Sequence, residues 1–257
     1  MKKLSIVTYN MRCPSQDDGK NYFPYRVPLI LDAINRHAPD VIGIQESTDL
    51  TRSALKQLND YTFVGCGRNN DYRGEGVSFL YRTDRFDLAE MNLRWLSDTP
   101  RKAGSRYEGI DQSHCPRVLL TALLVPVDTD QSPFRIYNLH TDHAGETARL
   151  QASRDLIALI EKDLMEAPLP FLVMGDLNAT PDAPEITLLS EHPAMTDVTT
   201  DLKITFHNWH SPDFAGSKID YIFASKDFSH EKTVLWTDTK DGIYLSDHHP
   251  VEATLLL

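Results

Sequence analysis

Cysteine is scarce in this chain of 257 residues: it occurs only as Cys13, Cys66 and Cys115, which are far apart and odd in number. A structural zinc knuckle needs cysteines at paired spacing, and that spacing is absent. No apolar run is long enough to span a membrane, and the apolar stretch near the N-terminus is too short for a signal peptide. We therefore expect reduced thiols, a cytoplasmic protein and no membrane partner.

Positive charge is also in short supply. The sequence has 26 Lys and Arg residues against 37 Asp and Glu residues, which gives a formal net charge of −11. This balance disfavours a protein that holds nucleic acid through a broad basic surface, so no stable nucleic-acid partner is expected. An enzyme that contacts a few phosphates locally remains compatible with it. A bound divalent cation would offset part of the acidic field.

Two common catalytic templates are missing. The sequence contains no Gly-x-Ser-x-Gly nucleophile elbow and no Gly-x-x-x-x-Gly-Lys-Ser/Thr phosphate loop. The three cysteines have no activating context, which makes a thiol nucleophile a poor hypothesis.

The hydrophobic content of 41% is enough for a sizeable core, and no low-complexity linker divides the chain, so we predict a single domain over 1–257. Asp49 is the expected N-cap of the second helix, and 117–127 and 134–140 are expected to pair antiparallel across a turn. Strands and helices interleave, which predicts an α/β fold: a four-layer sandwich of two packed mixed β-sheets flanked by helices. The predicted strands are 4–10, 40–46, 61–65, 76–82, 86–95, 117–127, 134–140, 170–176, 218–224, 232–237 and 250–256, and the predicted helices are 26–37, 49–59, 145–165 and 182–191.

Several predicted strands end in a side chain that can bind a metal or move a proton. The ends of such strands can converge at one edge of a sheet, where open α/β sheets commonly place their ligand crevice. The repetition favours an active site over a set of unrelated turn residues. The side chains in question are those of Asn10, Glu46, His140, Asp176, Asn178, Asp247 and His248.

Two motifs are the most informative. In Gly-Asp-Leu-Asn at 175–178, Asp176 and Asn178 are two residues apart and can face one site, although a simple turn also favours them. Ser-Asp-His at 246–248 places a cation ligand beside a group that titrates near neutral pH. Asp220 lies in an apolar strand, where it needs a partner; it either orients His248 or forms a structural salt bridge. Glu46 is either a ligand of a hard cation or a cap of the next helix.

The segment from Asn138 to His143 has two interpretations. In the first, His140 contacts a phosphate. In the second, the segment is a metallo-β-lactamase-like zinc motif whose first histidine is replaced by Asn138, so that His140, Asp142, His143 and His248 would bind zinc. Zinc favours nitrogen and sulfur donors, and the missing histidine therefore favours the first interpretation.

Four long polar segments, 12–25, 66–75, 97–116 and 203–217, separate the predicted elements. Long segments of this kind are usually functional or disordered. They carry many of the cations of this acidic chain, which form either a solvated surface or a rim that binds phosphate. These cations are Arg12, Lys20, Arg68, Arg73, Arg101, Lys102, Arg106 and Lys203, with Arg117 just after the third segment.

Taken in order, these motifs resemble the endonuclease/exonuclease/phosphatase superfamily, which has the DNase I-like fold. The motifs are Thr8-Tyr9-Asn10, Gln45-Glu46, Asn138-Leu139-His140, Gly175-Asp176-Leu177-Asn178, Ile219-Asp220-Tyr221 and Ser246-Asp247-His248. The segment from Trp95 to Pro100, and His140-Thr-Asp-His with Arg149, are similar to an uncharacterised bacterial branch. The resemblance extends along the whole chain and implies a four-layer sandwich with Mg²⁺- or Mn²⁺-dependent phosphoester hydrolysis.

The resemblance also implies roles for individual residues. Glu46 would be the principal metal ligand, with Asn10 in its shell and Asp247 close by. Asp176 would position or deprotonate the attacking water. Asn178 and His140 would hydrogen-bond the phosphoryl oxygens. His248 would be the general base or would stabilise the transition state, with Asp220 orienting its ring.

A second group of residues is expected to contact substrate: Arg117, Asp142, His143, Arg149, His207 and Trp209. Arg149 can bind a phosphate bidentately, or it can form an ion pair on a helix surface. Trp209 lies in the fourth polar segment beside His207.

Our first hypothesis is a divalent-metal-dependent phosphoesterase, of the phosphodiesterase, nuclease or phosphatase class, that acts by direct attack of an activated water. The alternatives are a catalytically silent binding module with the same fold, and a zinc-dependent hydrolase of metallo-β-lactamase type. The substrate would be a small phosphate ester, a lipid headgroup or a short nucleic acid. The sequence does not decide the oligomeric state.

Overall fold

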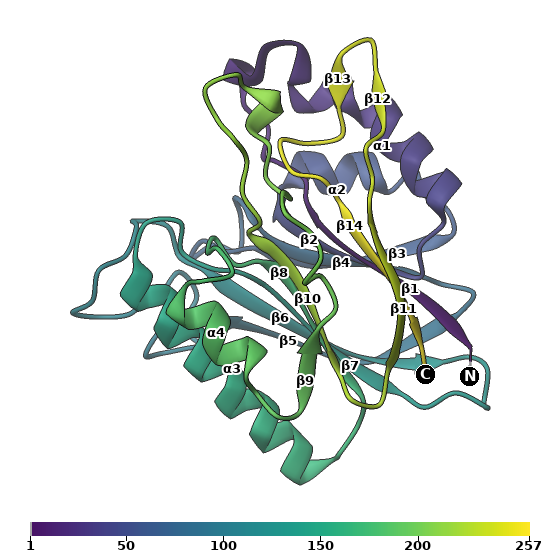
Figure 1. Cartoon of the computed structure of the whole chain (residues 1–257), viewed down its shortest axis with the longest axis vertical. Coiled ribbons are helices and arrows are strands. Elements are labelled where there is room, and N and C mark those ends of the chain that lie inside the picture. Colours follow the sequence, from purple (N-terminus) through teal and green to yellow (C-terminus); the bar gives the residue numbers. More distant parts are fainter. Residues whose placement is uncertain (1) are drawn as a thin grey trace.

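The computed structural model describes residues 2–257, and two mixed six-stranded β-sheets lie face to face at its centre (Figure 1). The first sheet has the order β11(Ser229–Leu235), β14(Val251–Leu256), β1(Lys3–Asn10), β2(Val41–Ser47), β4(Gly76–Arg82), β3(Tyr61–Gly67). The second has the order β5(Phe86–Trp95), β6(Val118–Pro126), β7(Phe134–His140), β8(Phe171–Asp176), β10(Asp220–Ser225), β9(Met195–Asp197). A small ribbon pairs β12(Thr239–Lys240) with β13(Ile243–Tyr244).

Helices cover both outer faces of the sheet pair. The first sheet packs against α1(Phe23–His37) and α2(Asp49–Leu55), and the second against α3(Glu146–Glu166) and α4(Pro184–Ser190) (Figure 1). The predicted four-layer α/β sandwich is therefore confirmed. None of the helices within residues 2–257 combines the length and the apolar character needed to cross a bilayer.

The predicted elements agree with the structure except at some ends and in short pieces. The N-cap of α2 is Thr48, whose hydroxyl accepts the N–H of Thr51, and Asp49 is the first helical residue, so the prediction of Asp49 as N-cap was wrong. β6 and β7 pair antiparallel as predicted. The three-residue strand β9, the β12–β13 ribbon and two 3₁₀ helices, η1(Gln16–Asn21) and η2(Asn208–His210), were not predicted.

Alternation along the strands decides which side chains lie between the two sheets. On β1, Ile6 lies in the core between the sheets, whereas Val7 packs toward the helices. On β8, Met174 lies between the sheets and Val173 faces the helices. Because successive side chains of a strand point to opposite faces, the inter-sheet rows continue into polar residues at the strand ends. Those residues are Asn10 on β1, Asn138 and His140 on β7, Asp176 on β8 and Asp220 on β10.

The strand register then brings these residues side by side. β7 and β8 run parallel with His140 opposite Asp176. β10 runs antiparallel to β8 with Asp220 also opposite Asp176. Three chemically active side chains thus occupy neighbouring positions on three adjacent strands.

A buried polar seam joins the two sheets just below this row. The side-chain amide of Asn138 donates to the carbonyl oxygens of Ile44, at 3.1 Å, and Ser78, at 2.9 Å. Gln45 in turn donates to Asn138 Oδ1 at 2.7 Å. Asn138 and Gln45 are fully buried, so these bonds replace hydration that both residues lost on folding.

The sheets approach closely here because β2 has a glycine at the contact. A Cβ atom on Gly43 would lie 2.4 Å from Met174 Sδ and 3.2 Å from Asn138 Cγ. Glycine at this position therefore allows the amide of Asn138 to reach the backbone of the other sheet.

Substitution of Asn138 tests the importance of the seam. Asn138→Ala leaves two buried carbonyl groups and a donor of Gln45 without their partner, and we expect it to lower the free energy of unfolding by about 3 kcal/mol. Asn92→Ala is the matched control, because Asn92 is exposed on β5 and its side chain bonds only that of Glu90 within residues 2–257. Urea unfolding measures both variants, and similar stabilities for the two would contradict the role of the seam.

Candidate active site

A cleft of about 400 Å³ opens at the edge of the sheets where the polar strand ends meet. It lies over the ends of β1, β2, β7 and β8 and is closed by the loops around Arg12, Arg68, Phe206 and Asp247. Its walls are formed by Arg12, Cys13, Glu46, Arg68, Glu75, Cys115, Arg117, His140, His143, Asp176, Asn178, Phe206, Ile219, Asp247 and His248.

Asp176 lies at the centre of the site. Its Oδ2 accepts the side-chain N–H of Asn10 at 2.8 Å and lies 3.5 Å from His140 Nε2 and 3.9 Å from His248 Nε2. Its Oδ1 accepts the backbone N–H of Asn178 at 2.9 Å. Burial, together with the charge of Asp220, raises the pKa of Asp176 well above its ordinary value. This carboxylate therefore sits among several groups that can exchange or share a proton.

The residues beside Asp176 adopt unusual backbone conformations. Gly175 has φ 153°, and a Cβ atom there would lie 2.0 Å from the carbonyl oxygen of Leu139 on β7. Asn178 has φ 47°, in the left-handed region that Asn tolerates better than most residues. Its side chain donates to Thr141 O at 3.2 Å and lines the cleft. Asp176 and Asn178 thus face one site, although the strand ends between them.

His248 and Asp220 form a hydrogen-bonded pair beside Asp176. His248 Nδ1 lies 2.8 Å from Asp220 Oδ2, and both residues are buried. Burial opposes protonation of the ring, but the charge and hydrogen bond of Asp220 and the charge of Asp176 raise the pKa of His248 to about 10. The ring of Phe206 packs on the imidazole with centroids 4.7 Å apart. The alternative of a salt bridge between Asp220 and a lysine or arginine therefore gives way to pairing with His248.

Glu46 faces this pair across the cleft. It follows Gln45 at an irregularity in the β2–β4 pairing and has φ 56°, a strained conformation for a glutamate. Its Oε2 accepts the N–H of Cys13 at 2.7 Å and its Oε1 the amide of Asn10 at 3.1 Å. Burial would raise the pKa of Glu46, but these hydrogen bonds and the charges of His248 and Arg12 hold it below its ordinary value. The side chain is therefore an ionised oxygen donor.

The donor set of the cleft suits a hard divalent cation. Glu46 and Asp247 both line it, and burial together with the charge of Glu46 raises the pKa of Asp247. Repulsion between the half-buried carboxylate of Glu46 and the buried carboxylate of Asp247 would be relieved by a cation between them. Cys13, Glu46 and Glu75 offer one set of potential ligand atoms within 4.8 Å of one another, and Asp176, Asp220 and His248 offer another. Oxygen-rich donors of this kind are those that Mg²⁺ and Mn²⁺ prefer.

Three arginines form the cationic wall of the cleft. Arg12 pairs with Asp18 at 3.1 Å and lies 3.8 Å from Asp247. Arg68 pairs with Glu75 at 2.8 Å. Part of the cationic rim considered from the sequence therefore lies at the site.

Arg117 differs from the other two arginines in having two buried nitrogens without a hydrogen-bond partner within residues 2–257. Its Nη2 bonds His143 Nδ1 at 2.7 Å, whereas its buried Nε and Nη1 have no hydrogen-bond partner within residues 2–257. Buried N–H groups of a guanidinium are costly to leave unpaired, and an anion in the cleft would satisfy them.

The structure places the other expected substrate contacts elsewhere. Asp142 accepts the backbone N–H groups of Ser113, Ala144 and Gly145 and so closes a turn. Arg149 pairs with Glu185 between α3 and α4, which is its ion-pair alternative. His207 stacks on His210. The Trp209 ring lies against the guanidinium of Arg26, with Arg26 Cζ 5.4 Å from the ring centroid. Within the second group of predicted residues, Arg117 and His143 line the cleft.

These positions also bear on the zinc alternative. The carboxylate of Asp142 is occupied by three backbone donors, and His143 Nδ1 is bonded by Arg117. Of the four expected ligands, His140, His143 and His248 line the cleft, and His140 and His248 flank Asp176. The arrangement favours oxygen ligation over a zinc site of metallo-β-lactamase type.

Sequence analysis missed several residues of the site. Cys13, Glu75 and Phe206 line the cleft without belonging to a recognisable motif. A further omission is Arg26 of α1, which is fully buried. Its guanidinium donates to the carbonyl oxygens of Met11, Arg12, Asn21 and Leu245, and so ties the loops at the cleft mouth together. An arginine among apolar helix residues is the signal that could have found it.

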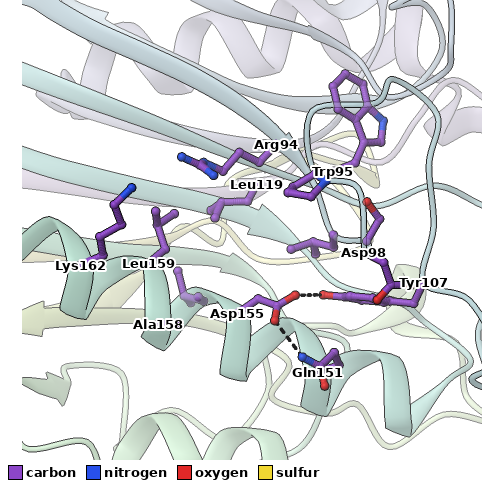
Figure 2. A pocket seen from close by; sticks show the side chains of 14 residues that line it. Arg94, Trp95, Asp98, Tyr107, Leu119, Gln151, Asp155, Ala158, Leu159 and Lys162 are labelled. Atoms are coloured by element: carbon purple, nitrogen blue, oxygen red, sulfur yellow. Dashed lines mark hydrogen bonds between the residues drawn. The ribbon is translucent and has the colours of Figure 1, made fainter.

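A second cavity, of about 420 Å³, lies between β5 and α3 and away from this chemistry. Figure 2 shows that its main carboxylate, Asp155, is already bonded by the Tyr107 hydroxyl, at 2.6 Å, and by the Gln151 amide, at 2.8 Å. The remaining wall is largely formed by apolar side chains such as those of Leu119 and Leu159. The candidate active site is therefore the cleft around Asp176.

Comparison with known proteins identifies the class to which this fold and site belong. A sequence model of the Endonuclease/Exonuclease/phosphatase family matches residues 7–248, and the chain belongs to this family. A search of curated proteins finds no match.

Solved structures share the whole architecture. An endonuclease/exonuclease/phosphatase from Bacteroides vulgatus is 26% identical, with a TM-score of 0.91 and complete coverage of both chains. A mannosyl-6-phosphatase from Bacteroides thetaiotaomicron is 25% identical, with a TM-score of 0.86 over 99% of this chain and 100% of the other. The human Nocturnin catalytic domain with bound sulfate anion is 19% identical, with a TM-score of 0.73 over 99% and 93% of the two chains, and shows the shared DNase I-like fold alone. The family match and the two Bacteroides structures support the phosphoesterase class.

Acid unfolding tests the structural role of Asp142. Burial alone would raise the pKa of this carboxylate, but hydrogen bonds from Ser113, Gly145 and Ala144 lower it to about 2. The native state therefore gains stability above the ordinary pKa of Asp and loses it as the pH falls toward 2. We expect Asp142→Ala to cost about 1 kcal/mol at pH 7, after allowance for solvent screening.

Urea unfolding at several pH values from 7 downward measures this difference, which should shrink below about pH 4. Asp87→Ala, on the exposed edge strand β5, is the control. A difference between wild type and Asp142→Ala that is independent of pH would contradict the assignment.

Proposed function

We propose that this protein hydrolyses a small phosphate monoester by direct attack of water, with Mg²⁺ or Mn²⁺ as its cofactor. The observation that supports this most strongly is the convergence of Glu46, Asp176 and His248 on one cleft from three distant parts of the sequence. A silent binding module would have little reason to bury the same acid, base and ligand groups together, because each carries a desolvation cost.

Glu46 and Asp247 would hold the cation, with Asn10 in the same shell. When bound, such a cation offsets the negative charge of the phosphate and stabilises charge that develops in the transition state. Asn10 already fixes the carboxylate of Glu46 relative to Asp176, because its amide donates to both. The ligand and the central acid are therefore oriented before substrate arrives.

The other residues would have separate roles in phosphoryl transfer. Asp176 would orient the attacking water and accept its proton. Asn178 and His140 would donate hydrogen bonds to the phosphoryl oxygens; burial and the charge of Arg117 lower the pKa of His140 and keep its ring neutral. His248, oriented by Asp220, would stabilise the negative charge of the transition state as an imidazolium.

Three observations favour a small monoester over a polymeric diester. A cleft of about 400 Å³ has the size of a small-molecule site. Its cationic wall of Arg12, Arg68 and Arg117 suits a phosphate with two negative charges. The mannosyl-6-phosphatase named above has the same architecture at 25% identity. A sugar phosphate is therefore the substrate class we propose, in preference to a lipid headgroup or a short nucleic acid.

Removal of either catalytic side chain should abolish turnover and leave the fold intact. We expect His248→Ala and Asp176→Ala to lower kcat on sugar phosphates at least about 100-fold, because each removes proton transfer or charge stabilisation at the phosphate. A chelator should have a similar effect on the wild type, reversed by Mg²⁺ or Mn²⁺. His230→Ala, at an exposed position of β11, is the control. Wild-type turnover in either catalytic variant, with an unchanged circular dichroism spectrum, would refute the assigned roles.

Arg117 provides a test of substrate class. Arg117→Gln removes a charged donor that we place against the phosphate, and KM for a monoester should rise about tenfold or more. KM for a bis-aryl diester should change less, because a diester carries one negative charge fewer. Arg94→Gln is the matched control, because Arg94 lines the second cavity. Equal losses for both substrates, or a diester preferred by the wild type, would contradict the monoester proposal.

A further inference from the structure

Three histidines gather outside the cleft, where two loops cross. Each of His207, His210 and His249 offers one ring nitrogen, and the three nitrogens lie within 4.8 Å of one another. The ring centroids of His207 and His210 are 4.1 Å apart, and those of His207 and His249 are 4.3 Å apart. Neither the fold family nor the proposed reaction accounts for this cluster.

The backbone explains why the cluster forms. Phe206 and His248 form an antiparallel bridge and direct their rings toward the cleft. Their neighbours His207 and His249 alternate to the other side, where they line a separate small cavity of about 50 Å³. The N–H of His207 donates to Asp247 O at 2.9 Å. The three histidines thus lie directly behind the segment that carries the catalytic histidine.

The turn after His207 completes the cluster. Asn208, Trp209 and His210 all adopt left-handed conformations, with φ between 46° and 57°. This tight reversal returns the chain on itself, and the N–H of His210 donates to the carbonyl oxygen of His207 at 2.9 Å. The His210 ring consequently stacks on that of His207.

The ring nitrogens are available as ligands. His207 is only 4% exposed, and its Nδ1 is buried without a hydrogen-bond partner within residues 2–257. Buried polar atoms without partners are rare in folded proteins, and a cation would satisfy this one. His249 Nδ1 lies 3.3 Å from the carbonyl oxygen of Trp236, which leaves its Nε2 lone pair free. His210 is exposed and can rotate.

We propose that His207, His210 and His249 bind a late first-row divalent cation, of the class of Zn²⁺, Co²⁺ and Ni²⁺, at a site separate from the cleft. Imidazole nitrogens favour these metals, whereas Mg²⁺ favours oxygen. Three protein ligands would leave a coordination position for water. Tetrahedral Zn²⁺ places its nitrogen ligands roughly 3.4 Å apart, and rotation of the exposed His210 closes the remaining distance.

The ion would act on the loops that flank the active site. His207 and His210 belong to the loop that carries Phe206, and His249 follows His248. A metal bound by all three would tie these loops together and fix the packing of Phe206 on His248. The binding site itself stands whether or not the proposed reaction is correct, because it shares none of the residues assigned to that reaction.

The test is a titration of the full chain with Co²⁺ in excess Mg²⁺, monitored by the visible absorption of tetrahedral Co²⁺. We expect one Co²⁺ to bind the wild type and His210→Ala to weaken binding at least about 100-fold, because it removes an exposed ligand with little effect on the core. His210→Cys should restore binding and add a thiolate-to-cobalt charge-transfer band. His230→Ala, which changes an exposed histidine of β11, should bind as the wild type does.

Glu46→Gln separates this site from the cleft. It removes the principal ligand that we assign to the catalytic cation, so it should abolish turnover and leave the Co²⁺ spectrum unchanged. A Co²⁺ signal that is lost in Glu46→Gln but kept in His210→Ala would assign the ion to the cleft and overturn the proposal. The absence of tetrahedral Co²⁺ absorption in the wild type would also overturn it, whatever the outcome for phosphate-ester hydrolysis.

Discussion

The amide of Asn10 is the contact on which the rest of the site depends, because it joins the two sheets at the point of the chemistry. It donates to Asp176 on the second sheet and to Glu46 on the first. No disulfide bond joins the two sheets within residues 2–257, so their relative position there rests on packing and on polar bonds such as these. The deeper seam of Asn138 and Gln45 keeps the sheets in register. The geometry of the candidate active site therefore depends on how the two sheets pack.

The same arrangement concentrates charge in a confined place. Glu46, Asp176, Asp220 and Asp247 are carboxylates at buried or nearly buried positions around one cleft. Their mutual repulsion is compensated by the His248 ring and the nearby arginines rather than by bulk water. Such a cluster is expensive in stability and is retained where function requires it. The repulsion among these carboxylates is thus concentrated at a place where a bound cation would reduce it.

The sequence predicted the centre of the site because strand alternation is a local property. Once 134–140 and 171–176 form strands with Ile136 and Met174 inside, His140 and Asp176 must face the same seam. It did not predict contacts that depend on how separate elements pack. Arg149 contacts Glu185 only because α3 lies beside α4. His207 points away from the cleft because its neighbour Phe206, and not His207 itself, pairs with His248. Short pieces such as β9 lack the length needed for a periodic signal.

The four hydrogen bonds of Arg26 have a consequence for when the cleft can form during synthesis. One buried side chain joins residues 11, 12 and 21 to residue 245. The first strand also lies between β2 and β14, so its own pairing is incomplete until the last strand arrives. During synthesis, the mouth of the cleft cannot assemble before residue 245 has left the ribosome. A nascent chain that still lacks residue 245 therefore cannot order the loops at the cleft mouth in this way.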